Sequence, residues 1–185
     1  MKWRNGIVVY KKQLNETQKL VLYFVIYSFL GWILETIFAL FVLGKFVKRG
    51  FLYGPVCPIY GFGAVLIILT LKRFKGKKTK EFFISMIVFS VFEYAVSWLF
   101  EMIFHLRWWD YSNDIGNING RISIAYSLAW GVIGLIFNEK VHPFIESKLD
   151  KTKSMISYEV QKIVVIILPI VMLTDFILSS MKYLS

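Results

Sequence analysis

Long apolar segments, separated by short polar connections, run along the whole chain. Most of them hold close to 20 residues, about the length that an α-helix needs to cross the roughly 30 Å hydrocarbon core of a membrane. The pattern predicts an all-α fold, a polytopic transmembrane helix bundle that forms a single integral membrane domain over 1–185. The predicted spans cover about 20–43, 55–71, 82–104, 122–137 and 163–181.

The second predicted span is short and has an unusual beginning. A helix over 58–71 reaches only about 21 Å, and Gly54–Pro55 and Cys57–Pro58 break a helix before it. We therefore expect non-helical backbone from 51–57 to enter the membrane, which is tolerated where protein or a water-filled cavity covers it. The alternative is a tight hairpin at the membrane surface.

The distribution of positive charge predicts the orientation of the spans. Of the 22 Lys and Arg residues, 5 lie in 1–19, 6 in 72–80 and 5 in 139–162, which leaves 6 for all other positions. An excess of Lys and Arg beside the spans marks the cytoplasmic side. We therefore expect the N-terminus inside, five crossings and the C-terminus outside, with 138–160 as an amphipathic connection on the cytoplasmic surface.

Composition and motifs narrow the class of protein further. Hydrophobic residues make up 57% of the chain and charged residues 18%, which differs from ordinary soluble domains. Because the positive charges cluster beside the spans, the net charge of +10 does not indicate nucleic acid as a partner. No GxxxxGKS/T, HExxH, CxxC or GxSxG motif occurs, and the sequence predicts no catalytic residue, no cofactor and no metal site.

Four acidic residues lie inside predicted spans. Glu35 is expected in the outer half of the first span, Glu93 near the middle of the third and Glu101 close to its outer end. Asp175 lies in the outer half of the fifth span. A charge at the bilayer centre costs about 2.5–3.5 kcal/mol even on the lenient insertion scales, so these carboxyl groups are expected to face the bundle interior or a wet cavity.

Helical spacing groups the polar residues into two stripes. Residues four apart lie on one face of a helix, so Glu93, Ser97 and Glu101 line a single stripe of the third span. Small residues in such a stripe let helix backbones approach closely in a membrane. The corresponding stripe of the first span consists of Ser28, Gly31 and Glu35.

The outer connection RWWDYSNDIGNINGR, over 107–121, combines aromatic and hydrogen-bonding side chains. Its aromatic residues are typical of anchors at the membrane interface, and its Asp and Asn residues allow it to cover a cavity as a lid. Arg121 is expected to begin the fourth span, where its charge opposes the helix dipole unless an anion compensates it. The expected partner of Arg121 is Glu35, Glu101 or an anionic ligand.

These positions predict an outward-facing polar pocket that binds a substrate. The alternative is structural: Glu35 and Glu101 pair with Arg121 or Arg107 and fix how the helices pack. The candidate substrate-binding residues are Glu35, Tyr60, Glu93, Glu101, Asp110, Asn119 and Arg121.

Three functions are compatible with such a pocket. The first is a permease-like transporter subunit, in which Glu93 takes part in proton coupling or a salt-linked gate. The second is an intramembrane enzyme that acts on a lipid or envelope precursor at the outer leaflet, with Glu101, Asp110 and Arg121 as its reactive groups. The third is a membrane scaffold or regulatory subunit. Five spans are few for a complete transporter, so a homodimer or a second membrane subunit is expected.

Five segments resemble, in the same order, a family of small bacterial membrane proteins, the CmpB-like ABC-transporter type IV permeases. The resemblance covers about 24–134 and implies a protein of the bacterial cytoplasmic membrane that works in transport with a separate ATPase. It carries over no functional residues, and the chain lacks the EAA-type cytoplasmic coupling loop of other ABC importers. The segments are LGWILET, GFLYGPVCPIYGFGAV, FEYAVSWLFE, WWDYS and NINGRISIAYSLAWGVIG.

Overall fold

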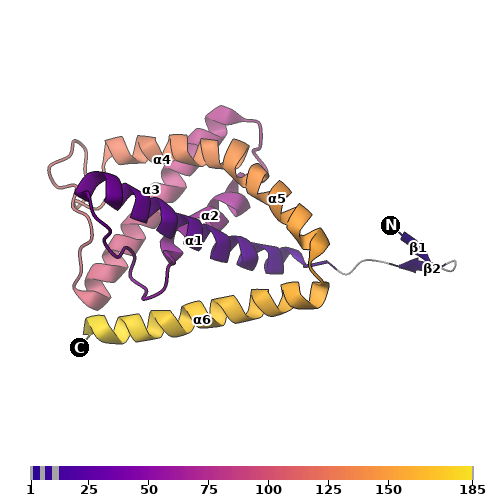
Figure 1. Cartoon of the computed structure of the whole chain (residues 1–185). Helices are drawn as coiled ribbons and strands as arrows, with labels where there is room; N and C mark the ends of the chain where they lie inside the picture. The colour runs from indigo at the N-terminus through magenta and orange to yellow at the C-terminus, as the bar shows by residue number, and fades with distance from the viewer. Residues whose placement is uncertain (1, 5–6, 10–12, 185) are drawn as a thin grey trace.

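The computed structural model describes residues 2–4, 7–9 and 13–184 (Figure 1). This part of the chain is mainly helical, with irregular connections over 44–57 and 105–123 and a short antiparallel hairpin near the N-terminus, so the predicted all-α fold is confirmed. The elements are β1 (Lys2–Arg4), β2 (Ile7–Val9), α1 (Glu16–Leu43), α2 (Pro58–Leu71), α3 (Lys78–Phe104), α4 (Ile124–Ile136), the π-helical turn η1 (Phe137–Val141), α5 (His142–Met155) and α6 (Tyr158–Leu184).

Three helices of the described chain are long and apolar enough to cross a membrane: α1 with 28 residues, α3 with 27 and α6 with 27. They contain the first, third and fifth predicted spans. Helix α2 has 14 residues, as its sequence predicts, but α4 has only 13 and is shorter than the predicted span. Two of the three missing residues are at its start, because Ser123 caps the helix, and one is at its end, where α4 passes into η1 at Phe137 and then into the polar helix α5.

Local signals set the ends of these helices. Asn15 caps α1, since its side chain accepts a hydrogen bond from the Gln18 N–H at 2.8 Å and the Gln18 side chain accepts one from the Asn15 N–H at 3.0 Å. Gly44 ends α1 in the left-handed conformation, with φ of 65°. Pro58 opens α2, where a missing N–H costs nothing, and Ser123 caps α4.

The predicted non-helical connection between α1 and α2 is held inside the bundle. Phe51 and Leu52 are buried beside Phe104. The Cys57 N–H donates to the carbonyl of Ser28, in the middle of α1, at 2.9 Å. This bond to α1, with the hydrogen bonds that the Tyr53 and Gly54 N–H groups donate to the Asp175 side chain of α6, replaces part of what a regular helix would supply, as irregular backbone at membrane depth requires.

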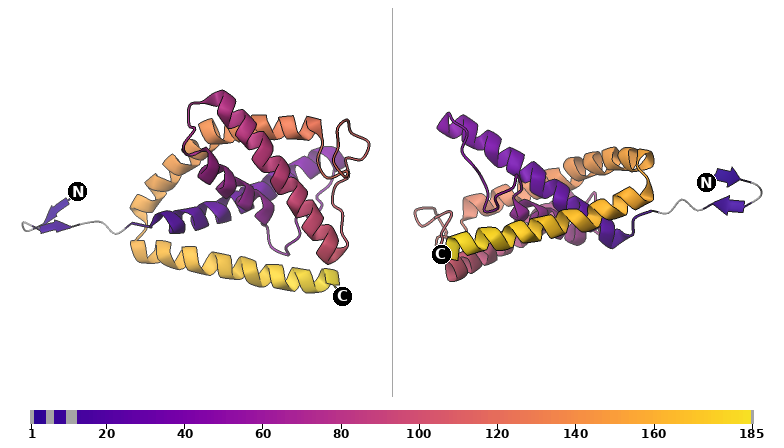
Figure 2. Two further views of the ribbon diagram at one scale, coloured as in Figure 1. Left: turned by 180° about the vertical axis from the view of Figure 1, so that it is seen from behind. Right: turned by 60° about the horizontal axis from the view of Figure 1, so that its bottom comes forward.

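Two close helix pairs form the bundle (Figures 1 and 2). Helix α1 packs against α2 and α3 against α4, while contacts between α2 and α3 join the pairs and α6 lies against α1 and α3. Glycines permit both close approaches: a Cβ on Gly61 would lie 2.2 Å from Ser28 Oγ, and one on Gly134 would lie 2.3 Å from Ser85 Oγ. Such small-residue contacts are typical of helix packing in membranes.

The surface of the bundle is apolar and much of its interior is polar. Phe41 is 85% exposed and Val91 64%, whereas Ser28 and Ser85 are fully buried. Water would penalise an apolar surface of this extent, but acyl chains do not. The distribution agrees with the predicted membrane location.

The connections and chain ends are sorted to the two ends of the bundle. The connection over 105–123 and the C-terminal end of α6 lie at one end, and the start of α1 and the turn between α5 and α6 lie at the other (Figures 1 and 2). This arrangement suits the predicted orientation, in which 105–123 and the C-terminus are both outside. The sidedness itself remains a prediction from the charges.

The close contact between α1 and α2 predicts a graded effect of alanine at two glycines. In the substitution Gly61→Ala, the new methyl group would meet the backbone oxygen of Phe24 at 2.5 Å, which cannot rotate away. We expect a loss of about 1–3 kcal/mol of stability, as for other overpacked sites. In Gly63→Ala the nearest atom is the ring edge of Phe89 at 3.0 Å, and the loss should be much smaller. Thermal unfolding in detergent micelles measures both, and equal effects would contradict the helix register described here.

Candidate functional site

The polar stripe of α3 faces α4 and the connection that precedes it. Ser90 donates from its hydroxyl to the hydroxyl of Ser127 on α4 at 2.8 Å. Ser97 accepts a hydrogen bond from Arg121 at 3.0 Å. Glu93 contacts residues of both segments. The predicted grouping of the stripe on a single face of the helix is therefore seen in the structure.

Glu93 is the most enclosed acid of this stripe, with 7% of its surface exposed. One carboxylate oxygen accepts a hydrogen bond from the Tyr111 hydroxyl at 3.1 Å, and the other accepts one from the Trp130 indole N–H at 2.9 Å. The Tyr111 ring in turn stacks on Tyr126, with 4.2 Å between the ring centres. Glu93 thus ties the connection over 107–121 to the interior of the bundle.

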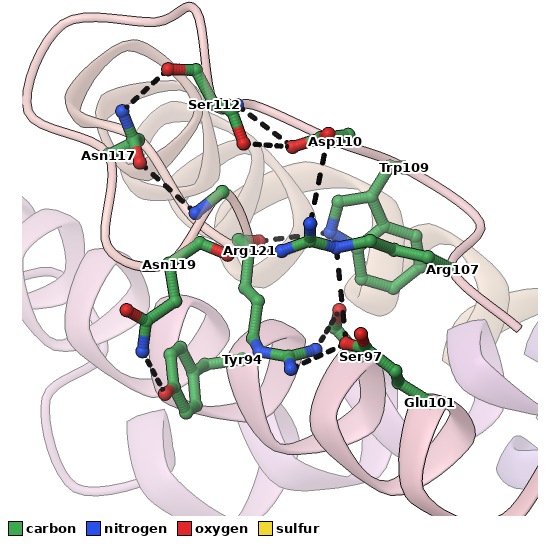
Figure 3. A network of polar contacts seen from close by, with 11 residues as sticks. Tyr94, Ser97, Glu101, Arg107, Trp109, Asp110, Ser112, Asn117, Asn119 and Arg121 are labelled. Carbon is green, nitrogen blue, oxygen red and sulfur yellow. Dashed lines mark hydrogen bonds and ion pairs between the residues drawn. The ribbon is translucent and has the colours of Figure 1, made fainter. Parts of the chain in front are cut away.

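Glu101 and Arg121 form the ion pair at the centre of the outer network (Figure 3). Arg121 Nη2 lies 2.5 Å from Glu101 Oε2, without the alignment of a hydrogen bond, and the Arg121 side chain is only 12% exposed. The Arg121 Nε atom is buried and has no hydrogen-bond partner. The sequence predicts Arg121 at the start of the fourth span, but it precedes Ser123, the cap of α4. The charge that lies nearest to its guanidinium is the Glu101 carboxylate.

Arg107 connects this pair to the rest of the connection (Figure 3). Its guanidinium lies 4.0 Å from Glu101 and 3.7 Å from Asp110, and it donates to the Asn119 carbonyl. The Asn119 side chain donates to the Tyr94 hydroxyl on α3 at 2.8 Å. The connection is therefore folded back on the end of α3 by contacts from Asn119, Arg107 and Arg121.

Asp110 is the most exposed acid of the network, with 54% of its side chain accessible. Hydrogen bonds from the hydroxyl and then the backbone N–H of Ser112 hold the pKa of Asp110 below its usual value, and Arg107 adds to the effect. Asp110 therefore stays ionised at neutral pH and balances one of the two arginines.

Glu35 and Tyr60 form a separate group between α1 and α2. The Tyr60 hydroxyl donates to one oxygen of Glu35, and Arg49 lies 3.1 Å from the other. A Cβ on Gly31, one turn before Glu35, would lie 2.3 Å from the Tyr60 ring, so the predicted stripe of α1 faces α2. The structural alternative offered by the sequence paired Glu35 with Arg121 or Arg107, but the structure pairs it with Arg49.

Asp175 holds the irregular connection from the side of α6. Its two carboxylate oxygens accept hydrogen bonds from the backbone N–H groups of Tyr53 at 2.8 Å and Gly54 at 2.7 Å. The Ser179 hydroxyl also donates to Asp175 at 3.0 Å. Two backbone N–H groups and one hydroxyl thus donate to this carboxylate.

The structure brings together most, but not all, of the predicted site residues. Five of them surround the end of α3 and the connection over 107–121, while the other two lie between α1 and α2. The aromatic residues of the connection are more than interfacial anchors, because Trp109 donates to the Arg121 carbonyl at 2.9 Å and Tyr111 to Glu93. The group at α3 consists of Glu93, Glu101, Asp110, Asn119 and Arg121, and the group at α1 and α2 consists of Glu35 and Tyr60.

Sequence reasoning missed Arg49, Tyr94 and Trp130 as members of these groups. Arg49 follows Lys48 in the connection before α2. Its sequence position does not distinguish it from other Lys and Arg residues that flank the predicted spans. Trp130 lies in the middle of an apolar helix, where only its indole N–H signals a need for a polar partner. Among the described residues, no group of three or more His, Cys, Asp or Glu side chains is arranged to hold a metal ion.

The ion pair predicts unequal effects of removing its two arginines. Arg121→Met leaves Glu101 with only the 4.0 Å contact to Arg107 and should cost about 2 kcal/mol, less than breaking a fully buried pair, because the Glu101 side chain is 42% exposed. Arg107→Met should cost below about 1 kcal/mol, as for exposed pairs. The double variant Glu101→Gln/Arg121→Met should recover part of the loss. Unfolding in mixed micelles measures this, and a double variant no more stable than Arg121→Met would show that the pairing is not what stabilises the protein.

Asp110 predicts a pH effect in the outer connection. A carboxyl pKa that is lower in the folded than in the unfolded protein contributes stability above the unfolded pKa, near 3.8, and loses it as the pH falls through the folded pKa. Ser112→Ala should raise the pKa of Asp110 towards its usual value. Carbon NMR of the labelled carboxyl groups measures the shift, with Ser180→Ala on α6 as the control. An unchanged Asp110 titration in Ser112→Ala would refute the assigned hydrogen bonds.

The comparisons with known proteins agree with this architecture. A family model described as "Putative ABC-transporter type IV" matches residues 22–180, which extends the resemblance beyond 134 to α6. No curated protein and no solved structure matches the chain. The family match spans most of the chain and, together with the three long apolar helices, identifies a membrane protein. The chain belongs to the ABC-transporter type IV family.

Proposed function

We propose that this protein is the membrane subunit of a transporter in which the network between α3 and the connection over 107–121 receives a polar substrate from the outer side. Glu93, Glu101 and Arg121 bind the substrate, and the connection acts as its lid. Asp110 and Asn119 stabilise the closed lid. Glu35 and Tyr60 form a second polar position on the same path, between α1 and α2.

The observation that carries this proposal is the incomplete pairing of the Arg121 and Glu101 side chains. Native proteins satisfy nearly all buried polar atoms, yet Arg121 Nε has no partner and Glu101 Oε2 accepts no hydrogen bond. Arg49 Nε, beside Glu35, is likewise buried and unpaired. A substrate with hydrogen-bonding or charged groups would complete both sets of contacts.

The lid mechanism follows from which contacts hold the connection closed. Tyr111 reaches Glu93 and Arg121 reaches Glu101, so two side chains of one connection are held by two acids of one helix. A substrate that competes for either acid weakens the hold on the connection. Binding and opening are thereby coupled, because the same carboxylates serve both.

The partner of this subunit is a separate ATPase on the cytoplasmic side. The family description supports a transporter component, and the chain has no phosphate-binding loop of its own. With the basic segment 72–80 inside, the end of the bundle formed by α5 and that segment would meet the ATPase. A second copy of the chain or another membrane subunit would complete the translocation path through the bilayer.

A second candidate function, as a scaffold or regulatory subunit, is favoured by the pairing that does exist. Glu35 forms an ion pair with Arg49 and accepts a hydrogen bond from Tyr60, and Glu101 lies within ion-pair distance of Arg107 and Arg121. Pairs of this kind fix the packing of helices without binding a ligand. The double variant Glu101→Gln/Arg121→Met separates the two functions, since a scaffold would keep its cellular activity and a transporter would lose it.

The experiment begins with full-length protein purified in mild detergent from its own membranes. We expect an ATPase subunit to co-purify, identified by mass spectrometry and by hydrolysis of Mg-ATP. Cells that lack the gene, complemented with wild type or with Glu93→Gln, are then compared for depletion of solutes from a defined medium. Glu93→Gln should keep the ATPase partner and abolish depletion of at least one solute that wild type removes.

The control for this experiment is Glu159→Gln, which alters an exposed acid at the start of α6 and should leave transport unchanged. Absence of any ATPase from the purified complex would overturn the assignment to an ABC-type transporter. Unaltered solute depletion in Glu93→Gln would remove Glu93 and its contacts from the substrate path.

A further inference from the structure

A second set of unsatisfied polar groups lies at the opposite end of α3, near the start of the helix. Glu81 is 0% exposed, and neither of its carboxylate oxygens has a hydrogen-bond partner. Ser85, one turn later, is also 0% exposed with an unpartnered hydroxyl. Asn138 in η1 is 6% exposed, and its Nδ2 atom is buried without a partner. Nothing in the network of Glu93 and Arg121 involves these three residues.

The antiparallel packing of α3 and α4 brings the three residues to one place. Ser85 lies against Gly134, and the Ser90 hydroxyl donates to the Ser127 hydroxyl at 2.8 Å. Higher residue numbers on α3 therefore face lower residue numbers on α4. Continued by one turn on each helix, this register brings Glu81 towards Asn138, and the Gly76 N–H, just before α3, donates to Glu139 of η1 at 3.1 Å. Ser85 lies one turn further along α3, so the three groups fall within two adjacent turns of the interface, and none of the three unpartnered groups has a hydrogen bond to another.

The neighbouring helix α2 contributes buried apolar side chains, and the helix winding changes at this position. Ile67 and Leu71 on α2 are 0% exposed, and α2 contacts both α3 and η1. Asn138 is the second residue of the π-helical turn η1. Such π-helical turns inside longer helices are frequent at functional sites, because the extra residue in the turn changes the backbone hydrogen bonding.

The negative charge of Glu81 has no counter-charge in ion-pair contact among the described residues. The start of α3 favours a negative charge, but the helix N-terminus does not saturate the two carboxylate oxygens. A buried carboxylate without a counter-charge is strongly unfavourable, and neutral partners such as Ser85 and Asn138 cannot cancel its charge.

We propose that Glu81, Ser85 and Asn138 form a binding site for one small monovalent cation of the Na⁺ class. One cation cancels the single carboxylate charge, and hard cations take carboxylate, hydroxyl and amide oxygens as ligands. Rotation of the Asn138 amide by half a turn presents its oxygen to the cation. A divalent ion does not fit the same donors, since it would leave a net positive charge in the helix interface.

This site is independent of the proposed substrate network. Glu81 and Glu93 are twelve residues apart on α3, or about 18 Å at 1.5 Å for each helical residue. The site lies at the end of the bundle where η1 and α5 meet the basic segment 72–80. A cation bound there fixes α4 against α3 at the end opposite the lid.

The test measures thermal unfolding of the full-length protein in detergent with NaCl or KCl, against N-methyl-D-glucamine chloride at the same ionic strength. Ligands that bind only the folded state raise its stability with concentration, so the unfolding temperature should rise and saturate with Na⁺ or K⁺ but not with the bulky cation. Glu81→Gln should abolish the rise. Glu139→Gln, which alters a neighbouring acid of η1 that bonds to the Gly76 N–H, should retain it.

Direct binding of radioactive ²²Na⁺ to the purified protein provides the second measurement. Ser85→Ala and Asn138→Ala keep the carboxylate and should weaken binding by about tenfold, as loss of a supporting ligand does at other metal sites. These variants decide the matter even if Glu81→Gln does not fold. Equal stabilisation by all three chloride salts, or Na⁺ binding that survives in Glu81→Gln, would overturn the proposal. So would stabilisation by acid alone with no response to Na⁺ or K⁺, because a proton would then neutralise Glu81.

Discussion

The structure depends on the need to satisfy polar groups inside a bundle whose outer surface faces hydrocarbon. A soluble protein can leave a carboxylate at its surface, but here the surface of the long helices is apolar and exposed. Each intramembrane acid therefore turns inward and takes its partners from neighbouring segments. Glu35 takes Arg49 and Tyr60, Glu93 takes Tyr111 and Trp130, and Asp175 takes two backbone N–H groups.

The same constraint explains why the connections before α2 and before α4 are well folded despite having no regular secondary structure over most of their length. The connection before α2 is bound by Asp175 and by the carbonyl of Ser28. The connection before α4 is bound by acids of α3, through Arg121 and Tyr111. Polar groups that are costly in the membrane thus serve to hold loops in place. The unpaired atoms that remain are those on which the proposed ligand sites rest.

Small residues decide which helices can form these contacts. Gly61 lets α2 reach α1 closely enough for Tyr60 to meet Glu35, and Gly134 lets α4 reach α3. Helix α3 carries one polar network around Glu93, Glu101 and Arg121 and, twelve residues before Glu93, the unpartnered Glu81. The two proposed sites thus concern separate parts of one helix that packs against α4.

The sequence alone determined the helical segments, their order and the stripes of polar residues, because hydrophobic length and helical period are properties of a single segment. It also placed Glu93, Ser97 and Glu101 on one face and offered Glu101 as one of three possible partners of Arg121. Only the tertiary structure decided which segments meet. It selected Glu101 for Arg121, assigned Arg49 to Glu35, began the fourth helix only after the cap Ser123 and buried Glu81 without a hydrogen-bond partner. Those outcomes depend on contacts between residues far apart in the chain, for which a single sequence carries no periodic signal.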